Sequence, residues 1–151
     1  MRLVDKVCLV TGGGRGIGRG IAGRIVVVSS LHSFLSFPQH AHYAASKGGM
    51  NSFMRTIANE LAPYDIRANA VIPGGVPEVG SEPDPAAWGP TIPLRRWGRP
   101  QDIARAVIFL ASEDADYMTG SIVTVDGGIM TRSPHYPPGE APTYPDLRKR
   151  P

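Results

Sequence analysis

Short apolar runs alternate with stretches of helical periodicity along the chain. Apolar residues three and four apart predict a helix over Tyr43–Leu61, which ends before Pro63, and a second helix that begins at Pro100. A third helix, begun at Ile17, is cut short by its glycines. Runs rich in β-branched residues predict four strands, at Leu3–Val10, Arg24–Ser30, Ile66–Ile72 and Ser121–Val125. Because strands and helices alternate, the chain is expected to form an α/β fold with a parallel sheet.

Three segments lack both patterns. Leu31–His42 is predicted to be a loop, and the proline-rich Val76–Gly98 is predicted to be a long loop or lid of the kind usually tied to function. Thr131–Pro151 has too few apolar residues to fold. We therefore expect one domain over residues 1–130, followed by a proline-rich, disordered tail over residues 131–151.

The formal net charge of +3 does not indicate a surface that binds nucleic acid, because residues after Met130 contribute +2 of it. No apolar run approaches the roughly 18 residues of a membrane span, and Asp5 and Lys6 interrupt the apolar N-terminal stretch, which argues against a secretory signal. A single cysteine, Cys8, excludes an internal disulfide and a Cys/His zinc cluster. A soluble cytoplasmic protein without nucleic-acid, membrane or metal partners is the expectation.

A glycine-rich turn, Thr11–Gly18, lies between the first predicted strand and the helix begun at Ile17. Glycines let a phosphate approach backbone N–H groups at a helix N-terminus, which is how a dinucleotide pyrophosphate is held. Arg15 could add a charge-assisted contact to a further phosphate. Taken alone, the run is equally consistent with a strand–helix connection that binds nothing.

Tyr43 and Lys47 are four residues apart on a predicted helix, so their side chains share one face. A tyrosine is a poor base at neutral pH, but a neighbouring ammonium favours the phenolate and brings proton transfer within reach. Ser30, at the end of a strand thirteen residues earlier, could hydrogen-bond a substrate carbonyl oxygen. Two solvated residues at the start of a helix would give the same Tyr-x-x-x-Lys spacing.

Pro73 and Gly74 follow the third predicted strand directly. Backbone at such a point could approach a flat ring closely, and the long loop after it could close over a substrate. An ordinary turn that ends a strand would look the same.

Thr-Gly-x-x-x-Gly-x-Gly, then Ser30, then Tyr-x-x-x-Lys, then Pro-Gly, in this order, resembles the short-chain dehydrogenase/reductase family. Residues 23–47 and 67–74 look like its active-site strand, loop and helix and its next strand. Tyr117–Gly120 and Val125–Gly128 are similar to its C-terminal ending. The resemblance implies an NAD(P)-dependent oxidoreductase that moves hydride between nicotinamide and a small carbonyl or alcohol substrate.

The resemblance also implies roles for particular residues. Ser30 would orient and polarise the substrate oxygen, Tyr43 would be the general acid/base, and Lys47 would support Tyr43 and bind the nicotinamide ribose. The pyrophosphate would be lined by Gly12, Gly16, Ile17 and Gly18, and the nicotinamide by Pro73, Gly74 and Val76. Glu78 stands where the family often has a threonine that contacts the cofactor.

The sequence departs from the family between Ala22 and Gly23, where the second to fourth strands are missing. The resemblance therefore implies a reduced Rossmann-like three-layer fold with about four strands. The remaining strands must close up or leave a gap between them, and the fold is expected to be only marginally stable. Residues that select NAD or NADP are absent, and Arg15 favours NADP. An alternative stays open, in which the chain is catalytically impaired and acts at most as an interaction module. In either case the Tyr43–Leu61 helix could support a homo-oligomer.

Overall fold

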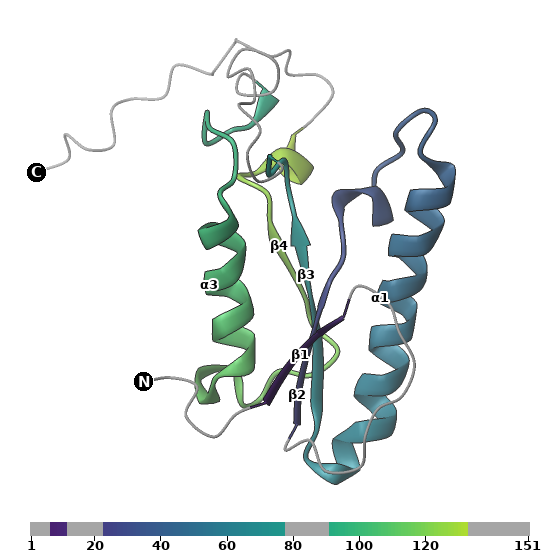
Figure 1. Cartoon of the computed structure of the whole chain (residues 1–151), viewed down its shortest axis with the longest axis vertical. Helices are drawn as coiled ribbons and strands as arrows, with labels where there is room; N and C mark the ends of the chain where they lie inside the picture. The colour runs from purple at the N-terminus through teal and green to yellow at the C-terminus, as the bar shows by residue number, and fades with distance from the viewer. Residues whose placement is uncertain (1–6, 12–22, 78–90, 133–151) are drawn as a thin grey trace, which may run out of the picture.

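The computed structural model describes residues 7–11, 23–77 and 91–132, which form three layers (Figure 1). Four parallel strands make the central sheet in the order β1 (Val7–Thr11), β2 (Gly23–Val28), β3 (Arg67–Pro73) and β4 (Ile122–Val125). Helix α1 (Ala41–Leu61) covers one face and helix α3 (Pro100–Ala111) covers the other. The predicted fold class, a reduced Rossmann-like α/β fold with a short parallel sheet, is confirmed.

Strand β1 pairs directly with β2, so the described strands close up and leave no gap. Thr11 is opposite Val27, and Val28 is opposite Val71 in the next strand. The carboxyl ends of β1, β2 and β3 therefore meet at one edge of the sheet. The described residues that follow β2 and β3 leave from that edge, where parallel α/β sheets bind their ligands.

The observed elements differ from the predicted ones mainly at their ends. Gly23 is the first residue of β2 rather than the end of a helix, and α1 begins at Ala41, two residues earlier than predicted. A 3-10 turn, η1 (Leu31–Ser33), interrupts the predicted loop because the Ser30 side chain accepts a hydrogen bond from the backbone of His32. Three further 3-10 turns are η2 (Ala62–Tyr64), η4 (Glu113–Ala115) and η5 (Ile129–Thr131).

The alternation of side chains along β2 and β3 divides the core into two halves. Ile25 and Val27 of β2 pack with Met54 and Ile57 of α1. Val26, between them in sequence, points to the opposite face, where it joins Val71 of β3 and residues of α3. Both faces of the central strands are thus apolar, which explains why the runs read as continuous rather than alternating.

Two buried arginines fasten the end of the sheet opposite the carboxyl ends of its strands. The guanidinium of Arg67 donates to the carbonyl oxygens of Leu110 and Ser112, at 3.1 and 2.9 Å, and so satisfies the C-terminal end of α3. Arg24 donates to Asp116 at 3.2 Å. These arginines are therefore engaged within the fold.

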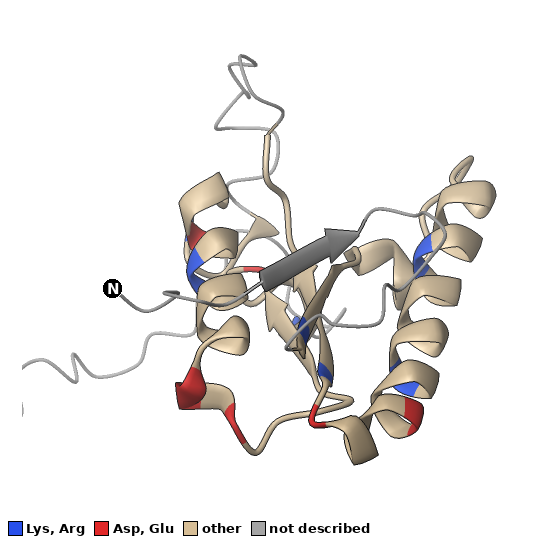
Figure 2. Cartoon of the chain, turned by 60° about the horizontal axis from the view of Figure 1, so that its bottom comes forward, with Lys and Arg blue, Asp and Glu red and all other residues tan. Residues whose placement is uncertain are grey.

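Charged residues of both signs occur on α1 and on α3 (Figure 2). The described residues carry no run of one sign along either helix. Among the same residues, no helix has the length and apolar character to cross a membrane.

Replacing Met54 by alanine is expected to lower the free energy of unfolding by about 2–5 kcal/mol, because Met54 is 0% exposed and its removal leaves a cavity between α1 and the sheet. Leu94→Ala is the control, since Leu94 is 65% exposed, and it should change stability by less than about 1 kcal/mol. Urea unfolding followed by circular dichroism measures both. Similar losses for the two variants would contradict the proposed core.

Candidate functional site

The end of β2 is joined to helix α1 by two hydrogen bonds. The buried Ser29 donates its hydroxyl to the backbone oxygen of Lys47 at 3.1 Å, and the Lys47 ammonium donates back to the backbone oxygen of Val28 at 3.2 Å. The main chain of Ser29 also donates to Val71 of β3 at 2.9 Å. These contacts fix the position of the next residue, Ser30, relative to the first turns of the helix.

Ser30 has extended backbone and forms the N-cap of η1. Its Oγ accepts a hydrogen bond of 3.3 Å from the backbone N–H of His32. A serine hydroxyl has one proton to donate and two lone pairs that accept. Because an N–H group occupies one lone pair, the Ser30 proton remains available for another acceptor.

Tyr43 and Lys47 lie one turn apart on α1, as their spacing predicted. The Lys47 Nζ is 5.5 Å from the centroid of the Tyr43 ring. Lys47 is half-buried and Tyr43 is 38% exposed, so the phenol is reachable from solvent while its neighbouring ammonium is partly shielded.

A cavity of about 330 Å³ opens at the carboxyl edge of the sheet. It is lined by Ser30 and Tyr43 together with Pro73, Gly74 and Val76, five of the residues that the sequence marked as catalytic or cofactor-binding. These residues are far apart in the sequence but close in space, because β2 and β3 end side by side in the sheet. The predicted residues are therefore gathered around one space, with Lys47 beside it.

The remaining predicted residues lie outside the described part of the chain. They are Gly12, Arg15, Gly16, Ile17 and Gly18, as well as Glu78. The described strand β1 ends at Thr11, opposite Val27 of β2. The described end of β1 thus lies at the edge of the sheet that carries Ser30.

The sequence did not reveal four of the residues that line this cavity, namely Leu31, His32, Phe37 and Gly75. Trp97 also lines it, from the predicted long loop Val76–Gly98. The ends of that loop are fastened together, because the backbone of Gly98 donates to Gly75 at 2.9 Å. A closer reading of the turn after Ser30 would have found His32, since the side-chain oxygen of a serine N-cap accepts a hydrogen bond from the backbone N–H two or three residues later.

The His32 imidazole lies inside an aromatic cluster. It stacks on Phe37 with 4.1 Å between ring centroids and meets the rings of His40 and Tyr43 edge to face, each at 5.0 Å. Burial, with a smaller effect from His40, holds the pKa of His32 below its ordinary value. Burial of the ring thus favours the neutral imidazole.

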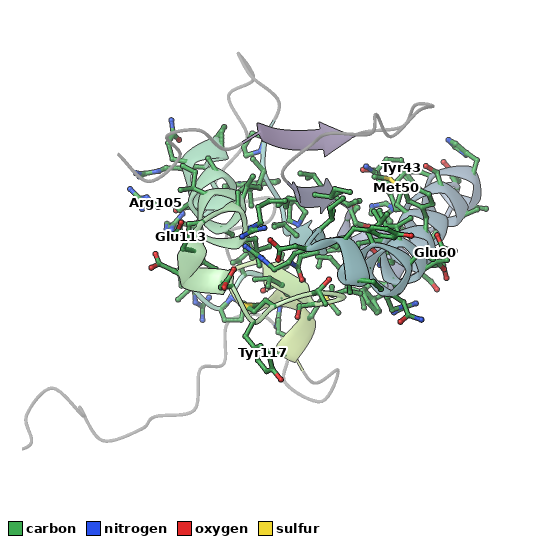
Figure 3. The ribbon with its side chains drawn as sticks, turned by 90° about the horizontal axis from the view of Figure 1, so that it is seen from below. Tyr43, Met50, Glu60, Arg105, Glu113 and Tyr117 are labelled. Atoms are coloured by element: carbon green, nitrogen blue, oxygen red, sulfur yellow. The ribbon has the colours of Figure 1, made fainter. Side chains whose placement is uncertain are left out.

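A second cavity, of about 200 Å³, lies on the other side of Gly74 and Gly75, toward α3. It contains the ion pair of Arg96 and Asp102, with 2.6 Å between Nη1 and Oδ2. Hydrogen bonds from Arg96 and from the backbone of Arg99 lower the pKa of Asp102 to about 2. Figure 3 shows the two sides of the sheet, with Tyr43 on α1 and Arg105, another wall of the second cavity, on α3.

Gly74 has a packing role that the sequence did not reveal. A Cβ atom built there would lie 2.5 Å from the Cα of Asp126, which follows β4. The main chains are close because the Gly74 N–H donates to the oxygen of Val125 at 2.9 Å. The need for glycine here is thus explained by the joined ends of β3 and β4, without a ligand ring.

Comparison with known proteins gives a consistent result. A family model described as enoyl-(acyl carrier protein) reductase matches residues 14–130. The chain is 40% identical over 112 residues to the 3-oxoacyl-(acyl-carrier-protein) reductase of Thermotoga maritima, covering 72% of this chain and 46% of the relative. It is 40% identical over 116 residues to the glucose 1-dehydrogenase of Gluconobacter oxydans, covering 73% and 44%.

Among solved structures, the chain is similar to a candidate 2-deoxy-D-gluconate 3-dehydrogenase from Agrobacterium tumefaciens with bound NADP. The TM-score is 0.68 and the identity 36%, and the match covers 74% of this chain and 48% of the other. The chain therefore spans about half the length of the curated relatives it matches.

Replacing Gly74 by alanine is expected to destabilise the fold by about 1–3 kcal/mol, because the added methyl group must push the ends of β3 and β4 apart. Gly49→Ala is the control. It lies within α1 with nothing near its missing Cβ, so alanine there should raise stability by about 0.5–1 kcal/mol. Thermal unfolding gives both values, and an equal response at the two glycines would refute the close packing at Gly74.

Proposed function

The chain belongs to the short-chain dehydrogenase/reductase family, and we propose that it is an NAD(P)-dependent oxidoreductase that interconverts a carbonyl compound and an alcohol. The observation that carries this proposal is the cavity shared by Ser30 and Tyr43, with the Lys47 ammonium beside the phenol ring. A hydroxyl, a phenol and an ammonium in one place suit a reaction in which a substrate oxygen gains or loses a proton.

Ser30 is the residue proposed to hold the substrate oxygen. Because its Oγ accepts from the His32 N–H, its own proton can be donated to a carbonyl oxygen. That hydrogen bond strengthens as negative charge develops on the oxygen, which stabilises the transition state of reduction.

Tyr43 is proposed to transfer the proton at its Oη. In reduction it gives the proton to the substrate oxygen, and in oxidation it takes the proton from the alcohol. Lys47 has three N–H donors and uses one for Val28, which leaves donors for a ribose hydroxyl. Its ammonium lies 5.5 Å from the centroid of the Tyr43 ring.

The donor groups fit the nicotinamide half of an NAD(P) cofactor. Ser30 and Tyr43 supply uncharged donors and Lys47 a cationic one. Pro73, Gly74 and Val76 line the same cavity without charged side chains. When bound, the nicotinamide would supply or accept a hydride. The pyrophosphate would be held by the glycine run, with Arg15 favouring the additional phosphate of NADP. The residues of that run are Gly12, Arg15, Gly16, Ile17 and Gly18.

The relatives support the reaction type more than any particular substrate. By their names, the Thermotoga relative acts on an acyl chain and the Gluconobacter relative on a sugar. The step common to them is carbonyl–alcohol interconversion. The proton transfer in that step is assigned to residues at the end of β2 and the start of α1, and the hydride would come from or go to the bound nicotinamide.

We also propose that α1 supports self-association. Phe53 is 53% exposed on this helix. Gly48 and Gly49 leave open space where side chains would stand, so another helix could approach closely. An exposed aromatic residue beside such a surface favours an oligomer formed through α1.

Cofactor binding and turnover test the enzyme proposal. NADPH is expected to show saturable fluorescence changes with the purified protein, and Arg15→Ala should weaken its affinity by about tenfold while leaving NADH nearly unaffected. An absence of saturation at millimolar concentrations of both cofactors would refute the proposal. Equal losses for the two cofactors in the Arg15 variant would refute the preference for NADP.

Tyr43→Phe should lower kcat for carbonyl reduction by at least about a hundredfold, because the ring stays while the transferable proton is lost. Cofactor affinity should stay within a few fold. Tyr64→Phe is the matched control, since Tyr64 is 74% exposed at the far end of α1, and it should keep full activity. Retained turnover in the Tyr43 variant would remove Tyr43 from its assigned role.

Size-exclusion chromatography with light scattering tests the role of α1. An oligomer is expected at micromolar concentrations, and Phe53→Ser should shift it toward the monomer because it removes exposed apolar surface from the helix. A wild-type protein that stays monomeric at all concentrations would contradict the proposal.

A further inference from the structure

The candidate cavity has an uncharged lining. None of the described residues that line it is Asp, Glu, Lys or Arg. The neighbouring cavity toward α3 contains Arg96, Asp102 and Arg105. A substrate fragment that carries a carboxylate or phosphate would therefore find no cationic side chain among the described residues that line the cavity at Ser30 and Tyr43.

The contacts within the fold do not explain why one residue of this lining carries a polar ring. The Nδ1 atom of His32 is buried and has no hydrogen-bond partner among the described residues. Burying a polar atom without a partner costs free energy. A phenylalanine at this position would make the same stacking contact with Phe37 and the same edge contact with Tyr43 without that cost. The packing alone therefore does not account for a histidine.

The position of the ring suggests where a partner would come from. The backbone of His32 is tied to Ser30, and its ring lies 5.0 Å from that of Tyr43. A half-turn about Cβ–Cγ keeps the stack on Phe37 and moves the nitrogen to the other edge of the ring. Because His32 lines the same cavity as Ser30 and Tyr43, an oxygen bound by this imidazole in the cavity would lie near the carbonyl proposed to be bound there.

We propose that His32 is a specificity-determining residue that hydrogen-bonds a hydroxyl group next to the reacting carbonyl, so that the preferred substrates are uncharged hydroxyketones. This inference rests on the proposed function, because it takes the carbonyl to be bound at Ser30 and Tyr43. A neutral imidazole has one donor and one acceptor nitrogen, which suits a hydroxyl group. The aromatic walls formed by Phe37 and Trp97 suit the apolar remainder of such a molecule.

Two matched ketones test the proposal, 2-hydroxycyclohexanone and cyclohexanone, which differ only in the hydroxyl group. Their affinities are measured by NMR titration of the imidazole Cε1–H signals, with and without NADPH. Wild-type protein should bind the hydroxyketone about tenfold more tightly. His32→Phe keeps the ring contacts and should reduce this ratio to about one. His40→Phe, which changes the other ring beside His32, is the control and should keep the tenfold preference.

The wild-type spectrum is a second readout that does not depend on how a variant folds. The His32 signal should shift more with the hydroxyketone than with cyclohexanone. The proposal is overturned if the wild-type protein shows no preference, if neither ketone binds, or if His32→Phe retains the preference.

Turnover separates the two proposals. Reduction of both ketones at equal efficiency would leave the proposed function standing and remove the role of His32. A His32-dependent preference in binding, without reduction by NADPH or NADH, would leave the role of His32 standing and remove the enzyme proposal.

Discussion

Two hydrogen bonds between the end of β2 and helix α1 hold the candidate site together. Ser29 donates to the backbone of Lys47, and Lys47 donates to the backbone of Val28. The end of the strand thus donates one hydrogen bond to the helix and accepts one from it. If this joint were loose, Ser30 and Tyr43 would be free to separate, because they belong to different elements with a turn and a loop between them. The lysine therefore has a structural role as well as its proposed chemical one.

The sequence predicted those features that depend on local pattern. Val26 and Val27 marked a buried strand, and the spacing of Tyr43 and Lys47 placed both side chains on one helical face. The sequence did not predict the features that depend on contacts between residues distant in the chain. The reason for glycine at position 74 is Asp126, which no nearby residue indicates. The missing hydrogen bond of His32 is likewise visible only once Phe37 and Tyr43 surround the ring.

The direct pairing of β1 with β2 lets a chain of about half the relatives' length form a parallel sheet whose strand ends share one edge. A parallel crossover needs about a dozen residues or more, and the segment between Thr11 and Gly23 is close to that limit. The described sheet is narrow, but its strand direction is uniform. All of its strands still run the same way, so the ends of β1, β2 and β3 share one edge. The groups proposed for proton transfer come from β2 and α1 and do not depend on the width of the sheet.

The segment Gly74–Gly75 separates two cavities of different chemistry at this edge. On the α1 side the lining is aromatic and uncharged, and on the α3 side Arg96 and Asp102 form an ion pair. The wall between them is thin because Gly74 lets the main chains of β3 and β4 meet. A larger residue would widen that wall and shift Pro73, which lines the cavity beside Ser30. The packing of one glycine against Asp126 thus determines both the closeness of the strands and the shape of the space in which the proposed chemistry takes place.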